Sequence, residues 1–160
     1  MDVWQEIELY EGKLILNLPG DFSSILAEEI PDDITPIFPQ YAFTNTEDVF
    51  ILVKADTYEI QDTMDEVKKI YDVLKNREKD FQLIMAQQRI LDEVSQAMMC
   101  YTTDVHDKQK YYMLTLCEFN GVQCLYLSCC LYSEKNRWEP IFNQIIDSIK
   151  VRIGERDGQK

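Results

Sequence analysis

The sequence is poor in basic residues and holds only one histidine. Its 16 lysines and arginines face 29 aspartates and glutamates, which gives a formal net charge of -13. This balance argues against binding to nucleic acid or to an anionic membrane through a general basic patch, because such patches work by replacing counterions with lysine and arginine. No apolar run approaches the roughly 20 residues that a membrane-spanning helix needs. We therefore expect no nucleic acid and no membrane among the partners.

Features of an exported protein are also missing. The start, MDVWQEIEL, lacks the basic and apolar regions of a secretory signal. The cysteines are odd in number and lie in apolar, strand-like segments, which is typical of reduced thiols rather than of a disulfide framework. They are Cys100, Cys117, Cys124, Cys129 and Cys130. We therefore expect a cytoplasmic location.

The chain has the length and composition of one folded unit. Its 160 residues are enough to bury a core, and 46% hydrophobic with 28% charged residues is ordinary for a globular protein. No internal repeat and no Pro/Gly/Ser-rich linker divides it. We expect a single α+β domain over residues 1–153 and a polar tail over residues 154–160.

Hydrophobic periodicity predicts the secondary structure. Alternation and β-branched content predict strands at Trp4–Leu9, Lys13–Leu18, Gln40–Thr44, Val49–Ala55, Phe81–Ile90, Val94–Thr103, Lys110–Phe119 and Val122–Tyr132. Apolar residues spaced by three and four predict helices at Asp62–Asn76 and Trp138–Val151, with Pro140 in the first turn of the second. Hairpins without alternating βαβ units predict an antiparallel, meandering β-sheet with two amphipathic helices packed on it.

This layout resembles a known fold family. The LNLPGDF segment is followed by strands, an amphipathic helix, a long meander and a helix of the form W…F…II.SI, whose residues are Trp138, Phe142, Ile145, Ile146, Ser148 and Ile149. The whole is similar to the PsbP-like α+β fold, which includes DcrB-type bacterial proteins and the Eag chaperones of type VI secretion effectors. The resemblance implies a binding or accessory role and carries no shared catalytic residues.

No residue pattern indicates chemistry. The only histidine, His106, has no identified nucleophile beside it. The cysteines lack the spaced pairs of a zinc site, and the acidic cluster Glu28, Glu29, Asp32 and Asp33 does not match a calcium loop. We expect no enzymatic activity, no cofactor and no metal.

The most informative segment is the last hairpin, because Asn120-Gly121 between alternating strands predicts a two-residue turn. That turn pairs Cys117 with Cys124 and leaves neither face of the hairpin polar. One face carries leucines, and the other carries tyrosine, methionine and cysteine. The hairpin is therefore either covered on both faces within the chain or open to a partner on one. We hypothesise that the helices pack on the leucine face and that a partner covers Tyr111, Met113, Phe119, Val122 and Tyr126.

Three functions follow from this reading. The leading hypothesis is a protein-binding adaptor, as a chaperone for a secreted effector or another apolar client segment, with a homodimer as one assembly. The alternative is an acidic, immunity-type inhibitor of a cationic toxin. An enzyme with an unrecognised site is the least favoured.

Overall fold

A computed structural model describes residues 3–30, 39–56, 63–78, 80–91, 94–105, 107–119 and 122–151. The Asn120-Gly121 turn, His106, the pair Asp32-Asp33 and the tail over residues 154–160 lie outside this part of the chain. Within it the fold is α+β. Its elements, in chain order, are β1 (Trp4–Leu9), β2 (Leu14–Pro19), β3 (Ser23–Ile25), β4 (Tyr41–Thr44), β5 (Phe50–Asp56), α1 (Thr63–Arg77), β6 (Gln82–Leu91), β7 (Val94–Val105), β8 (Lys108–Phe119), β9 (Val122–Leu131), α2 (Lys135–Asp147) and β10 (Lys150–Val151).

The strands form two antiparallel sheets. The larger has seven strands in the order β3-β4-β5-β9-β8-β7-β6, and the smaller has three in the order β1-β2-β10. The predicted register of the β8–β9 hairpin is confirmed, since Phe119 pairs with Val122 and Cys117 with Cys124. The predicted first hairpin is confirmed as well. Its turn uses positive φ angles at Tyr10, Glu11 and Gly12, of which only glycine adopts that region without steric cost.

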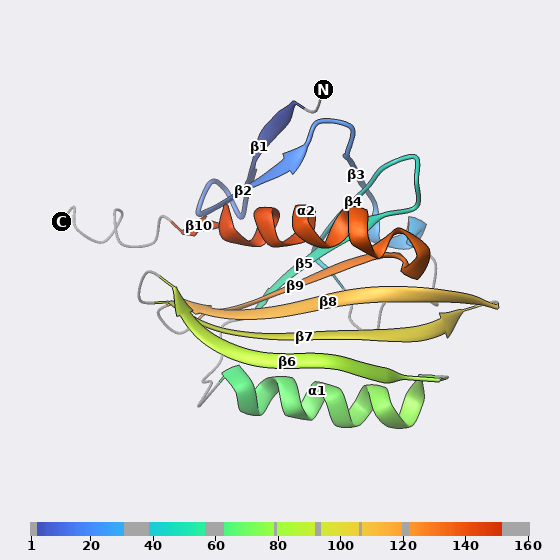
Figure 1. The fold of residues 1–160 in the computed structure, drawn as a ribbon. Coiled ribbons are helices and arrows are strands. Elements are labelled where there is room, and N and C mark those ends of the chain that lie inside the picture. The colour runs from blue at the N-terminus through green and yellow to red at the C-terminus, as the bar shows by residue number, and fades with distance from the viewer. Residues whose placement is uncertain are drawn as a thin grey trace.

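The two helices lie on opposite faces of the large sheet, with α2 between that sheet and the small one (Figure 1). Helix α2 packs with β1, β2 and the odd-numbered side chains of β8, while α1 packs with the leucines at even positions of β8. The hypothesis that both helices pack on the leucine face is therefore wrong. Alternation indicates that each face is buried but does not indicate which element covers it.

Helix α2 differs from its predicted bounds at both ends. It begins at Lys135, after a 3₁₀ turn over Tyr132–Glu134, so Pro140 lies inside the helix rather than in its first turn. It ends at Asp147 because Ser148 stops it: the Ser148 hydroxyl donates to the Ile145 carbonyl at 2.6 Å and accepts from the Asn17 amide at 2.9 Å. After the helix, strand β10 pairs with β2. The apolar spacing in the sequence predicts instead that the residues of β10 belong to the helix.

Candidate functional site

The predicted partner-binding face is core. Tyr111, Met113 and Tyr126 are 0%, 1% and 1% exposed, and they belong to one apolar cluster with α2 and with β1–β2. Their assignment to an interface is therefore a wrong prediction for these three residues, because α2 and the small sheet supply the cover that the sequence did not reveal. Phe119 and Val122 pair at the end of the hairpin, and their side chains lie outside the described part of the molecule.

Tyr111 reaches through this core to a polar group on α2. Its hydroxyl donates to Oε2 of Glu139 at 2.6 Å, and Lys135 Nζ lies 3.5 Å from Oε1 of the same carboxylate. The Lys135 ammonium also stands 5.4 Å from the centroid of the Tyr111 ring. Burial raises the pKa of the Tyr111 phenol, so the hydroxyl keeps its proton and remains a donor. These contacts attach α2 to the sheet.

All five cysteines are buried thiols. Burial raises the pKa of Cys100 and Cys117, and it raises the pKa of Cys130 to about 12. Since the thiolate is the reactive form, neutral buried thiols are poor nucleophiles and poor metal ligands.

We expect every thiol to stay reduced and unreactive in the folded protein, including Cys117 and Cys124, which face each other across the hairpin. Their two strands would have to distort to close a disulfide, because a two-residue turn makes Cys117 and Cys124 a hydrogen-bonded pair, and side chains are farther apart at such pairs than at non-hydrogen-bonded ones. A thiol reagent at pH 8 should label no cysteine before unfolding and all of them in denaturant. Intact mass measured without reductant should show no loss of two hydrogens. Such a loss mapped to this pair would contradict the expectation.

A surface cleft of about 500 Å³ lies between β1 and the β3–β4 hairpin. Its walls mix apolar and polar side chains: Gln5, Ile7, Glu8, Leu9, Phe22, Ser23, Ser24, Ile25, Gln40, Tyr41, Ala42 and Phe43. Gln5 Nε2 donates to the carbonyls of Pro19 at 3.1 Å and Phe22 at 2.9 Å, near the start of β1. Just after its end, the Tyr10 amide donates to the Tyr41 hydroxyl at 3.0 Å. Strand β1 is therefore fixed beside the cleft near both of its ends.

The cleft runs along the margins of two sheets. Among the described residues, strand β1 is one of the two outer strands of the small sheet, and β3 is one of the two outer strands of the large sheet. Three consecutive residues of β1, Ile7 to Leu9, and three of β3, Ser23 to Ile25, line it. Three consecutive residues of β4, Tyr41 to Phe43, line it as well, although β4 is paired on both sides, with β3 and with β5. Unpaired strand edges carry amides and carbonyls that can pair with another extended chain.

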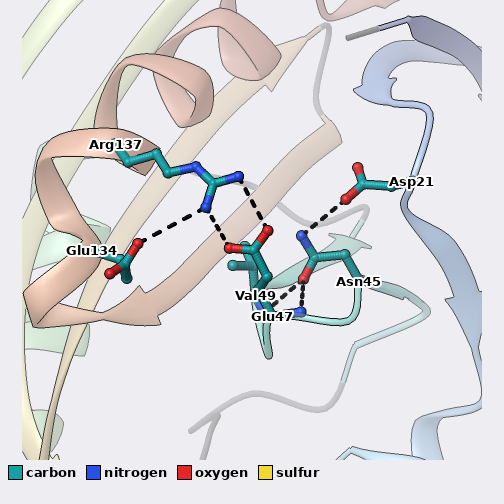
Figure 2. A network of polar contacts seen from close by, with 6 residues as sticks. All are labelled: Asp21, Asn45, Glu47, Val49, Glu134 and Arg137. Atoms are coloured by element: carbon teal, nitrogen blue, oxygen red, sulfur yellow. Dashed lines mark hydrogen bonds and ion pairs between the residues drawn. The ribbon is translucent and has the colours of Figure 1, made fainter. Parts of the chain in front are cut away.

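A polar network joins the β4–β5 turn to α2, as Figure 2 shows. Asn45 Oδ1 accepts from the amides of Glu47 at 2.9 Å and Val49 at 3.2 Å, which holds the turn. The Arg137 guanidinium donates to both carboxylate oxygens of Glu47, and Glu134 lies 3.9 Å from it. These contacts tie the β4–β5 turn to the start of α2, so the network has a structural role.

The described residues contain no group of three or more His, Cys, Asp or Glu side chains placed to hold a metal ion. Nor does that part of the chain contain a helix long and apolar enough to cross a membrane. The cleft is therefore the candidate binding feature considered among the described residues. Sequence reasoning missed it, because its walls come from three segments whose proximity depends on the tertiary fold.

Comparison by sequence finds no match: no family model and no curated protein matches this chain. Comparison by structure finds several. Cyanobacterial PsbP (CyanoP) from Synechocystis sp. PCC 6803 superposes with a TM-score of 0.67 at 11% identity, over 95% of this chain and 94% of that one.

LpqN, involved in cell envelope biogenesis of Mycobacterium tuberculosis, has a TM-score of 0.65 at 12% identity, over 94% of this chain and 91% of its own. PA94 from Pseudomonas aeruginosa, a protein of unknown function and putative regulator, has a TM-score of 0.58 at 12% identity, over 93% and 97%. The fold is therefore PsbP-like, as the sequence predicts. At such identities the likeness extends to the fold alone.

Proposed function

We propose that this protein is a non-enzymatic binding protein, an adaptor or chaperone, that holds an extended segment of another protein in the cleft between β1 and β3. The observation that carries the proposal is that β1 and β3, each an outer strand of its sheet among the described residues, line one cleft together. Addition of a strand to such an edge is a common way of recognising peptides: backbone hydrogen bonds give affinity, and pockets for alternate side chains give specificity. We also propose a cytoplasmic location, which the buried thiols support.

The chemistry of the walls defines the segment. The half-buried Ile7 offers apolar contact, and the exposed Glu8 offers a carboxylate. The whole chain has a net charge of -13, so a basic residue in the segment gains from the local and the overall field. The segment should therefore alternate apolar with polar residues and carry a lysine or arginine opposite Glu8.

The test blocks the cleft without touching the core. Ser24 is exposed and pairs with Phe43 across β3–β4, so its side chain shares the face of Phe43. In Ser24→Trp the indole should fill the cleft, and selection from a phage library of random peptides should lose the enriched sequences found with the native protein. Ser133→Trp, at an exposed serine in the 3₁₀ turn before α2, is the matched control and should keep them.

Two outcomes would count against the proposal. One is the absence of any enriched peptide with the native protein, and the other is equal enrichment with Ser24→Trp. Binding that disappears in high salt while the cleft variant still binds would favour the acidic inhibitor instead, because salt screens exposed charge and leaves apolar burial intact.

A further inference from the structure

Three buried polar atoms between α2 and the large sheet have no hydrogen-bond partner among the residues that the structure describes. They are Oγ1 of Thr115, Oγ of Ser128 and Nε1 of Trp138. Thr115 pairs across the sheet with Tyr126, and Ser128 pairs with Met113, so both hydroxyls lie on the face that α2 covers. A buried hydroxyl without a partner has lost its hydration with no hydrogen bond in return, so it weakens the packing that buries it.

The elements that cover this face form a separate layer, which we call the terminal layer. It consists of β1, β2, α2 and β10 (Figure 1). Among the described residues, β1, β2 and β10 form a sheet of their own, and none of these strands pairs with a strand of the large sheet. Separation of the terminal layer would therefore leave every ladder of the large sheet intact.

Side-chain contacts cross the boundary between the terminal layer and the large sheet, and two of them are exposed ion pairs. Arg137 pairs with Glu47 and Arg89 pairs with Asp147, and these side chains are 37–56% exposed. Such pairs contribute little to stability, because water and salt screen them. Apart from the hydrogen bond between Tyr111 and α2, the layer is held mainly by its apolar contacts with the sheet.

We propose that the terminal layer unfolds locally as one unit while α1 and the seven-stranded sheet remain folded. Its elements depend on the large sheet, because a helix of 13 residues and a small sheet are marginal in isolation. When the layer leaves the sheet, its backbone amides exchange together and the hydroxyls of Thr115 and Ser128 regain water. Because β1 is one wall of the cleft, the same event dismantles the cleft, although the opening depends on no ligand there.

Hydrogen exchange of the native protein, followed by nuclear magnetic resonance, tests the cooperative opening. The amides of β2 and α2 should share one opening equilibrium constant, at least about tenfold larger than that of the amides of β7 and β8. Separate constants for β2 and α2 would overturn the proposal, because the layer would not act as one unit. Equal protection of the layer and of β7 and β8 would overturn it as well. The opened form remains a small minority, so the thiols of this face stay protected in a brief labelling reaction.

Thr115→Val tests whether the opening uncovers the α2 face. Valine has nearly the shape of threonine, and Thr115 is 0% exposed with an unpartnered hydroxyl. Because this hydroxyl regains water only in the opened form, its removal should lower the opening constant of β2 and α2 about fivefold. Ser128→Ala removes the second unpartnered hydroxyl and should lower the same constant.

The matched control is Thr103→Val on the α1 face of the sheet. Thr103 is 1% exposed, and its hydroxyl donates to the Tyr112 hydroxyl at 3.4 Å. This bond persists while α1 stays folded, so the opening constant of the layer should not change, whereas the amides of β7 and β8 should exchange faster. A layer constant that is unchanged or larger in both Thr115→Val and Ser128→Ala would overturn the proposal. A change in Thr103→Val as large as that in Thr115→Val would do the same, because both faces would then open together.

Discussion

Replacing Tyr126 with glutamate is expected to unfold the protein. Tyr126 is 1% exposed, in the core between the large sheet and the layer of α2 and the small sheet. Burial holds the pKa of its phenol well above the ordinary value, which indicates how unfavourable a charge is at this position. A carboxylate there costs several kcal/mol in lost hydration, and a domain of this size has roughly 5–15 kcal/mol of stability in all. Far-ultraviolet circular dichroism and urea unfolding would measure the loss.

The matched control is Tyr132→Glu. Tyr132 is 42% exposed in the 3₁₀ turn before α2, so the same substitution there should change the free energy of unfolding by about 0.5 kcal/mol or less. A folded Tyr126→Glu protein with the native urea midpoint would mean that water reaches this face. In that case the packing of α2 on the sheet described above would be incorrect.

Ile145→Ala is expected to lower the free energy of unfolding by about 2–5 kcal/mol, the usual range for removing a buried aliphatic side chain. Ile145 is 1% exposed and lies on α2 in the same cluster as Trp138 and Phe142. The loss combines the transfer of the removed methyl groups with the cavity that remains. The loss should be near the upper end of this range of about 2–5 kcal/mol if the small sheet, which packs on the other side of α2, prevents the cavity from collapsing.

Equilibrium unfolding in urea, monitored by tryptophan fluorescence, gives the value for Ile145→Ala. Val73→Ala serves as the control, because Val73 is exposed on α1 and little surface is uncovered there. A change below about 1 kcal/mol for Ile145→Ala would show that α2 packs with another face toward the sheets. Equal effects of the two substitutions would lead to the same conclusion.

The sequence was a good guide wherever a signal was local. The alternation around Asn120-Gly121 predicted the register of β8 with β9, and the spacing of Val67 and Leu74 predicted α1 to within a residue. It failed where a structure depends on distant partners. Strand β3 has three residues and, among the described residues, pairs only with β4, whereas β10 has two residues and forms by pairing with β2. Neither is long enough to produce a periodic pattern.

The site was harder to predict than the fold for the same reason. An apolar face indicates that it is buried but does not indicate which element covers it. Tyr111 and Met113 would give the same sequence pattern whether a partner or α2 covered them. The cleft is the reverse case. Ser23, Ser24 and Gln40 are ordinary loop-type residues in sequence, and they line a common space because β1 from one sheet lies beside β3 and β4 from the other.

The order of strands in the large sheet has a consequence for synthesis. Strand β5 pairs with β9, so Phe50 can pair with that strand only after Cys129 has been synthesised. Strand β2 pairs with β10, so Ile15 can pair with Lys150 only when the chain is nearly complete. The strands from β6 to β9 pair with their chain neighbours and can form a meander by themselves. On the ribosome the first third of the chain therefore emerges with its local pairs, β1–β2 and β3–β4–β5, before the strands β9 and β10 that complete its sheets. Its apolar strands depend until then on the acidic residues around them, or on cellular chaperones, to avoid aggregation.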